Sequence, residues 1–205
     1  MKALIFDFDG TIADSFETLL GVFEKITSRP QKLTPTEIKN LRGSSLKQIT
    51  RYLKIKKWQI PKLIIKAKRE IAIKITDIKP FKELPGVLKK LHEDGHQMFI
   101  LSTNGSENIA RFLKINNLDS YFVRIYGDIG LRSKASALKK IMKKQKISSA
   151  DCIYIGDEVR DIESAKKAGV TSVAVGWGFN YPHALKQANP DALAEKPKDL
   201  LRILE

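Results

Sequence analysis

The chain has 205 residues and a formal net charge of +14. It contains no apolar run near the ~18 residues of a membrane span, and its first apolar stretch is too short for a secretory signal, so we expect a cytoplasmic protein without a membrane partner. Its one cysteine, Cys152, excludes an internal disulfide.

Five segments are predicted to be buried strands, because each is a run of aliphatic or aromatic residues that ends in Gly, Asp, Ser or Asn. Helical patterns of apolar residues lie between the later strands. This alternation predicts an α/β fold in which a Rossmann-like parallel sheet carries helices on both faces. In chain order, the predicted strands are residues 2–8, 97–102, 122–126, 151–155 and 171–176, and the predicted helices of this core are 84–94, 106–115, 133–146, 161–168 and 199–204.

Residues 14–80 interrupt this alternation and show helical patterns only. We therefore predict a core of residues 1–13 plus 81–205 and a small all-helical cap of residues 14–80. An insertion directly after the first strand lies at the carboxyl edge of the sheet, where open α/β folds bind ligands, so we expect the cap to act as a lid. Its predicted helices are residues 15–27, 35–41, 44–53 and 60–75.

The predicted cap is also strongly basic. Residues 14–80 hold 16 lysines and arginines against 6 aspartates and glutamates, so ten units of the net charge lie there. A positive lid would attract an anionic substrate, although a solvated basic face explains the same composition. Our candidate for a direct substrate contact is Arg42, in the loop before Gly43. Zinc-finger, RNA-recognition and basic heptad patterns are absent from the sequence, so we expect no nucleic-acid partner.

Two carboxylates, Asp7 and Asp9, stand at the end of the first predicted strand. Positions i and i+2 of a strand face the same way, so the pair would share one side. Burying both carboxylates is costly unless a cation lies between them, which indicates a divalent metal; a solvated acidic turn is the alternative. Gly10 lets the backbone turn sharply after the pair. The full motif is Phe6-Asp7-Phe8-Asp9-Gly10-Thr11.

Two later segments place polar groups at the start of helices. Thr103 and Asn104, between the second strand and its helix, offer a hydroxyl and backbone amides to a phosphate oxygen, or they simply cap the helix. Lys134 opens a later helix, where the macrodipole favours anions rather than cations. A bound phosphate would explain that position; the alternative is one more surface lysine.

An acidic cluster follows the fourth predicted strand. Asp157, at the strand end, could complete an oxygen shell for Mg²⁺. A capping box would explain Asp161, which is placed to cap the next helix, but it would not explain Asp157. The role of Glu158 stays open. The cluster is Gly156-Asp157-Glu158-Val159-Arg160-Asp161.

These four patterns, in this order and over the whole chain, resemble the haloacid dehalogenase-like superfamily of phosphohydrolases. The helical cap after strand one resembles that of its phosphoglycolate-phosphatase-like group, and so does the segment Val175-Gly176-Trp177-Gly178-Phe179-Asn180. The resemblance implies the fold of that superfamily, a Mg²⁺ cofactor and an aspartyl-phosphate intermediate. One departure is Ala135, which follows Lys134 where the family commonly has proline.

The resemblance also implies a role for each candidate residue. Asp7 matches the nucleophile, and Asp9 matches the general acid and base, whose backbone carbonyl also binds the metal. Asp157 matches a direct Mg²⁺ ligand beside Asp7, and Asp161 matches a carboxylate of the outer shell. The groups that match the phosphate-holding positions are the Thr103 hydroxyl, the Lys134 ammonium and the Asn104 backbone N–H.

The sequence therefore predicts a Mg²⁺-dependent phosphatase of a small anionic phosphorylated metabolite, with phosphoglycolate among the candidates, working as a monomer or weak homodimer. A sugar-phosphate mutase of the same fold is an alternative, weakened because Leu46 stands where the mutase cap generally has an arginine. A dehalogenase of the superfamily would need no metal, and Asp9 and Asp157 argue against it. The alternative from another class is a basic, non-enzymatic binding protein on this fold.

Overall fold

The computed structural model describes residues 1–27, 33–42, 44, 46–130 and 133–205. Gly43, which follows Arg42, and Ser45 of the predicted helix 44–53 lie outside the described residues. Six strands form one parallel sheet in the order β3-β2-β1-β4-β5-β6, which confirms the predicted α/β core. The strands are β1 (Ala3–Phe6), β2 (Gln97–Leu101), β3 (Phe122–Tyr126), β4 (Cys152–Gly156), β5 (Thr171–Val175) and β6 (Ala192–Ala194).

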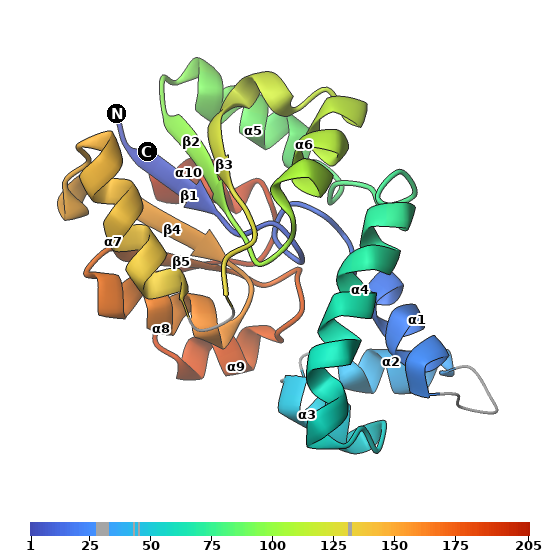
Figure 1. Cartoon of the computed structure of the whole chain (residues 1–205). Coiled ribbons are helices and arrows are strands. Elements are labelled where there is room, and N and C mark those ends of the chain that lie inside the picture. Colours follow the sequence, from blue (N-terminus) through green and yellow to red (C-terminus); the bar gives the residue numbers. More distant parts are fainter. Residues whose placement is uncertain (28–32, 43, 45, 131–132) are drawn as a thin grey trace.

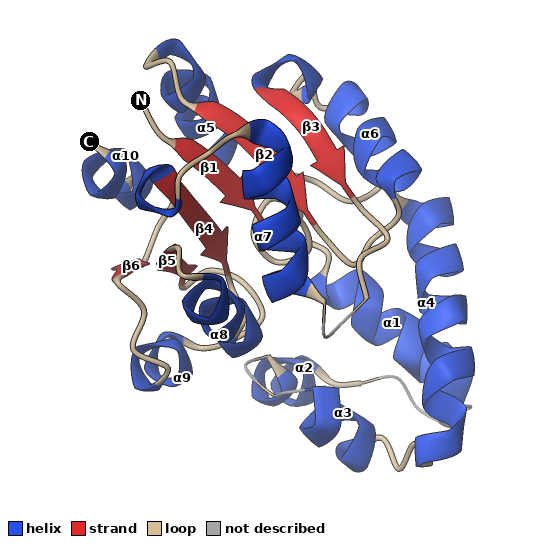
Figure 2. Cartoon of the chain, turned by 60° about the vertical axis from the view of Figure 1, so that its left-hand side comes forward, coloured by secondary structure: helices blue, strands red, loops and turns tan. Residues whose placement is uncertain are grey.

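Helices cover both faces of this sheet (Figure 2). Successive residues of β1 point to opposite faces: Leu4 and Phe6 pack with α5, α6 and α10, whereas Ala3 and Ile5 pack with α7 and α8. The core helices are α5 (Leu84–Glu93), α6 (Ser106–Ile115), α7 (Lys134–Gln145), α8 (Val159–Ala168), α9 (Pro182–Gln187) and α10 (Asp199–Leu204). Short 3₁₀ helices lie at η2 (Asp119–Tyr121) and η3 (Ser149–Asp151).

The first strand is shorter than predicted. We expected residues 2–8, but β1 ends at Phe6, and only the Asp7 amide continues the ladder, donating to the Ile155 carbonyl at 2.8 Å. The backbone then turns, because the amides of Thr11, Ile12 and Ala13 all donate to the Phe8 carbonyl. Asp9 therefore lies in a turn and not in the strand.

Strand β6 and helix α9 were not predicted from the sequence. Strand β6 is only three residues long and pairs at the sheet edge with β5, so it gives no apolar run to detect. Helix α9 spans six residues and buries Leu185, which is too short for a repeating helical pattern. Both elements extend the core beyond the five predicted strands.

Helices α1 to α4 stand together on the side toward which the strands point (Figure 1). The chain enters and leaves this helical region side by side: Ala13 pairs with Pro80 in an antiparallel bridge, and the Asp14 amide donates to the Lys79 carbonyl at 2.9 Å. Among the described residues, no helix combines the length and the apolar character needed to cross a bilayer. The elements of the region are α1 (Phe16–Thr27), α2 (Pro35–Leu41), α3 (Leu46–Tyr52), the 3₁₀ turn η1 (Lys57–Gln59) and α4 (Ile60–Lys74).

Candidate active site

Three buried carboxylates meet at the carboxyl ends of the two central strands. Asp7 follows β1, Asp157 follows β4, and Asp161 lies in the first turn of α8. Because β1 and β4 are parallel neighbours with Phe6 opposite Ile155, the residues that follow them emerge side by side. Carboxylate oxygens of the three aspartates lie within 4.8 Å of one another. The structure thus brings together the acidic groups that the sequence placed on separate strand ends.

Lys134 is the cation of this cluster. It begins α7, and its side chain, only 1% exposed, places Nζ 2.5 Å from Asp7 Oδ2 and 2.6 Å from Asp161 Oδ1. The surface-lysine interpretation is therefore wrong. Burial opposes the charge on Lys134, but Asp161 and Asp7 outweigh that cost and raise the pKa of the ammonium. Lys134 stays charged and bridges two carboxylates.

The carboxylates respond differently to burial. Desolvation raises the pKa of Asp7 to about 7, although Lys134 pulls it down. Desolvation also opposes ionisation of Asp161, but there Lys134 and Arg160 prevail and hold the pKa below its usual range. The Asp157 pKa lies well above its usual range, because of burial first and then the charges of Glu158 and Asp7. Two of the three carboxylates, Asp7 and Asp157, therefore resist ionisation in the metal-free protein, whereas Asp161 is held ionised.

Asp157 sits in a tight cradle. The Thr11 hydroxyl donates to Oδ1 at 2.8 Å, and the Phe179 amide donates to Oδ2 at 2.7 Å. Two glycines make room for this carboxylate: a Cβ on Gly10, whose φ is +78°, would lie 2.2 Å from Asp157 Oδ2, and one on Gly178 would lie 2.3 Å from Asp157 Cβ. Backbone turns on both sides therefore close on Asp157.

Asp9 has partners of its own. Its carboxylate accepts hydrogen bonds from Ser15 Oγ at 2.7 Å and from Asn104 Nδ2 at 3.0 Å, and it is not in the cluster of Asp7, Asp157 and Asp161. The expectation that Asp7 and Asp9 share one strand face is wrong, because β1 ends before both. Burial raises the pKa of Asp9, while the hydrogen bonds from Ser15 and Asn104 oppose the shift.

The loop between β2 and α6 carries the other predicted phosphate-binding groups. Asn104 is buried, and its side chain reaches Asp9. Its backbone N–H donates to Ser102 Oγ at 3.1 Å within the loop. Thr103 is half-buried beside it. Their roles toward a phosphate stay predictions.

The residues present fit a divalent cation. Mg²⁺ takes carboxylate and carbonyl oxygens as ligands, and a buried group of three carboxylates with one lysine is an unfavourable arrangement until a cation offsets the repulsion. The raised pKa values of Asp7 and Asp157 reflect first the burial of these carboxylates and then the charges of their acidic neighbours. Among the described residues, each side-chain oxygen of Asp157 accepts a single hydrogen bond, which leaves lone pairs for a metal ion.

Several residues of the site were not predicted from the sequence, or were given no role there. Thr11 stands in the quoted motif but had no assigned role, and Phe179 acts through its backbone amide, which no side-chain pattern can indicate. Tyr154 donates from its hydroxyl to Asp161 Oδ1 at 3.2 Å. Glu158, whose role was left open, is the N-cap of α8 in a capping box with Asp161, and it pairs with Arg160.

Arg42 lies at the boundary between the helical region and the core. It ends α2, its guanidinium carbon stands 5.0 Å from the centre of the Phe16 ring, and its Nη2 is 3.7 Å from Asp14 Oδ1. Burial raises the pKa of Asp14, and Arg42 opposes that shift. A contact between Arg42 and a substrate stays a prediction.

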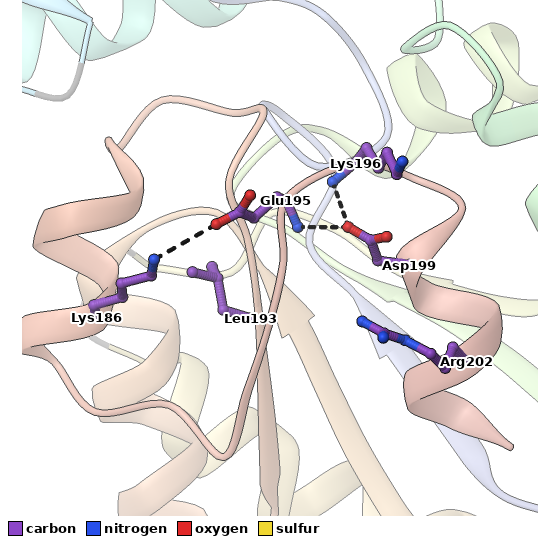
Figure 3. A pocket seen from close by; sticks show the side chains of 6 residues that line it. All are labelled: Lys186, Leu193, Glu195, Lys196, Asp199 and Arg202. Atoms are coloured by element: carbon purple, nitrogen blue, oxygen red, sulfur yellow. Dashed lines mark hydrogen bonds and ion pairs between the residues drawn. The ribbon is translucent and has the colours of Figure 1, made fainter.

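A separate hollow of about 530 Å³ lies beside α9, β6 and α10 (Figure 3). Its charges are largely matched locally: Lys186 pairs with Glu195 at 3.5 Å, and Asp199 accepts the amides of Glu195 and Lys196, each at 3.0 Å. None of its lining residues belongs to the carboxylate cluster. The lining residues are Lys186, Leu193, Glu195, Lys196, Asp199 and Arg202.

The chain matches a known protein family over most of its length. The profile of the haloacid dehalogenase-like hydrolases matches residues 4–175. The chain is 32% identical to a phosphoglycolate phosphatase from Synechococcus elongatus, over 98% of this chain and 96% of that relative. It is 27% identical to the pyrophosphatase PpaX from Listeria welshimeri, over 100% of this chain and 96% of the relative.

Solved structures share the fold. A haloacid dehalogenase-like family hydrolase from Streptococcus pneumoniae aligns with a TM-score of 0.83 at 23% identity, covering 100% of this chain and 99% of that one. The similarity includes helices α1 to α4 as well as the sheet, since the alignment spans the whole chain.

Proposed function

Because this chain belongs to the haloacid dehalogenase-like hydrolase family and is a phosphatase, we propose that it hydrolyses a small phosphorylated metabolite through a phosphoryl group carried transiently on Asp7. The observation that supports this most is the buried cluster in which Asp7 lies 2.5 Å from Lys134 Nζ and beside Asp157 and Asp161. The phosphatase assignment sets aside the non-enzymatic binding protein considered above.

In the first step, an Asp7 oxygen attacks phosphorus, and the bond from phosphorus to the leaving oxygen breaks. Asp9 gives its proton to that oxygen, which departs as an alcohol. In the second step, water attacks phosphorus and returns a proton to Asp9, the bond from phosphorus to Asp7 breaks, and phosphate leaves. Asp9 suits this role because burial raises its pKa, so that it can hold a proton closer to neutral pH.

Lys134 supports the first step from the side of the nucleophile. An ammonium has three N–H donors, and here two of them face Asp7 and Asp161. Within the described part of the chain no third acceptor is hydrogen-bonded to Lys134 Nζ, and we propose that the third donor binds a non-bridging phosphoryl oxygen. We propose that the Thr103 hydroxyl and the Asn104 backbone N–H hold the remaining oxygens; for the amide this requires release of its hydrogen bond to Ser102.

The proposed cofactor is Mg²⁺. Asp7, Asp157 and the backbone carbonyl of Asp9 would hold it, while Asp161 would act in the outer shell through Lys134 and the Glu158 amide. When bound, the ion would neutralise charge on the phosphoryl oxygens. Asp161 accepts hydrogen bonds from three groups, Lys134, Tyr154 and the Glu158 amide. The side chains of Asp7 and Asp157 each accept two in the described structure, which is why we place Asp161 outside the direct ligands.

Residues 14–80 are proposed to form a cap that selects the substrate. The paired entry and exit of this segment at Ala13 and Pro80 would let it move as a unit, and its ten excess positive charges favour anionic substrates. Arg42, at the boundary with the core, is the proposed substrate contact.

Phosphoglycolate is the substrate we propose first, because it combines a phosphate with a short carboxylate that a basic cap would attract, and because a relative carries that activity in its name. Pyrophosphate is the second candidate, supported by the relative named as a pyrophosphatase. Phosphate release from a panel of phosphorylated metabolites tests both, with a hexose monophosphate included to detect a mutase. An isomerised sugar phosphate without free phosphate would overturn the proposal. The test is needed because the sequence argument against a mutase rests on Leu46, whose side chain lies outside the described part of the chain.

A further inference from the structure

Phe179 is one of the residues that link the interior of the helical region to the core, beside Leu19 of α1, which packs against the apolar clusters of both. Seven buried apolar residues of the helical region form a cluster, and Phe179, from the loop after β5, packs against it. Its ring lies 5.3 Å from the ring of Phe16, the first residue of α1, at an angle of 59°. The buried members of this cluster, here called the cap core, are Phe16, Leu20, Leu33, Leu41, Ile49, Leu53 and Leu63.

The backbone of the same residue holds Asp157. The Phe179 amide donates to Asp157 Oδ2 at 2.7 Å, and the next amide, of Asn180, donates to the Asp157 carbonyl at 3.3 Å. Gly178 passes so close that any side chain there would collide with Asp157. Three consecutive residues therefore enclose Asp157, and the middle one carries the ring that enters the cap core.

Neighbouring residues strengthen the same loop at both ends. Trp177 Nε1 donates to the Thr11 carbonyl at 3.1 Å, and the Asn180 side chain accepts the Val159 amide at 2.9 Å. The Tyr181 hydroxyl donates to the Lys39 carbonyl in α2. Residues 177–181 thus contact the turn after β1, the start of α8 and the cap helices at once.

We propose that Phe179 is a positioning residue that couples the cap to Asp157: packing of its ring in the cap core determines how firmly the loop holds the Asp157 carboxylate, and so how tightly a divalent cation binds. This inference rests on the proposed function in one respect, namely that Asp157 binds the cation. Linkage works in both directions, so a cation bound at Asp157 also favours the cap position seen here.

The first test measures the loop itself, in metal-free protein. Hydrogen exchange at the Phe179 amide reports its bond to Asp157 without requiring metal or activity. Phe16→Ala removes the ring that Phe179 packs against. In the described structure, Phe16 itself makes no hydrogen bond to Asp157. Faster exchange at the Phe179 amide in this variant is therefore expected only if the cap anchors the loop. Phe81→Ala is the matched control. The Phe81 ring centre lies 6.4 Å from that of Trp177 in the same loop, but Phe81 packs against the core cluster that contains Leu4 and Phe6.

The second test measures affinity for Mg²⁺ alone by calorimetry. Phe179→Ala and Phe16→Ala are each expected to weaken binding by about tenfold, the size typical of lost outer-shell support, and the double variant to be no weaker than either single one. Phe179→Leu, which refills the volume, should recover most of the affinity. In kinetics, the Mg²⁺ concentration for half-maximal rate should rise in both single variants.

An unchanged exchange rate of the Phe179 amide in Phe16→Ala would overturn the coupling. It would also be overturned if the fold-loss of Mg²⁺ affinity in the double variant equalled the product of the losses in the two single variants. Absence of Mg²⁺ binding in the wild-type chain would instead contradict the proposed function, and the exchange experiment would still decide whether the cap anchors the loop. Circular dichroism verifies the fold of each variant, and Phe16→Leu replaces Phe16→Ala if the latter does not fold.

Discussion

The ammonium of Lys134 and the carboxylate of Asp7 lie 2.5 Å apart, and both side chains are at least 96% removed from solvent. A pair so deeply buried is stable only while each charge has its partner. Here the lysine serves two carboxylates, since Asp161 lies at 2.6 Å on another side. The chemistry and the stability of the site therefore depend on one side chain.

Replacing that lysine leaves two buried carboxylates without the cation that contacts them. We predict that Lys134→Met lowers the free energy of unfolding of the metal-free protein by about 3–5 kcal/mol and abolishes phosphatase activity. Urea unfolding monitored by circular dichroism measures the change. Lys139→Met, an exposed position on the same helix, is the control and should shift stability little. Equal stabilities of the two variants would contradict the assigned ion pairs.

The glycine cradle predicts opposite effects for the same substitution at two glycines. In Gly178→Ala the new Cβ would lie 2.3 Å from both Asp157 Cβ and the Gly10 carbonyl oxygen, so the loop must move; we predict a loss of about 1–3 kcal/mol and weaker Mg²⁺ binding. In Gly86→Ala, within α5, nothing lies within 4 Å, and the better helix propensity should add about 0.5–1 kcal/mol. A fully active, equally stable Gly178→Ala variant would show that the loop does not enclose Asp157 as described.

Mg²⁺ affinity should depend on pH with a defined sign. Burial raises the pKa of Asp7 to about 7, so the metal-free protein keeps this proton up to about neutral pH, whereas a ligating carboxylate is ionised. Mg²⁺ must displace the proton, and affinity should rise as pH rises, by roughly tenfold per pH unit below about pH 7 from this group alone. Calorimetry at about pH 6 and about pH 8, in buffers of different ionisation enthalpy, also counts the protons released. Equal dissociation constants at the two pH values would exclude Asp7 as a ligand with this pKa.

Arg42 offers a test of the cap as the substrate-selecting part. If its guanidinium binds an anionic group of the substrate, Arg42→Ala should raise KM for phosphoglycolate by about tenfold, or about 1.4 kcal/mol, with a smaller change in kcat. Arg51→Ala removes the same charge from an exposed position of α3 and serves as the control. Equal effects of the two substitutions would indicate that the cap acts only through its net charge.

The sequence predicted the parallel core well because its strands are continuous apolar runs, and each of the five predicted strands overlaps an observed one. It also predicted which loops carry the acidic residues, since a carboxylate directly after a buried strand is conspicuous. Short elements such as β6 and α9 gave no periodic signal. Their place in the fold depends on packing against β5 and α8, which only the three-dimensional arrangement reveals.

The geometry of the site was harder to predict than its composition. Alternation along a strand suggested one shared face for Asp7 and Asp9, but the chain leaves the strand after Phe6 and sends the two carboxylates to different partners. Lys134 looked like a surface residue by composition, and its burial follows from long-range packing of α7 against the sheet. The support that Phe179 gives to Asp157 comes from a backbone amide, and backbone donors are invisible to residue patterns.

The central claim, that Asp7 is the nucleophile, is tested most directly by phosphate release from Asp7→Asn on the best substrate of the panel, at saturating Mg²⁺. The variant keeps the shape of the side chain, and circular dichroism verifies its fold, with Asp77→Asn, an exposed position, as the matched control. We predict that Asp7→Asn loses at least roughly 10³-fold in kcat, while Asp77→Asn keeps the wild-type rate. A folded Asp7→Asn protein that still turns over within an order of magnitude of wild type would contradict covalent catalysis at Asp7.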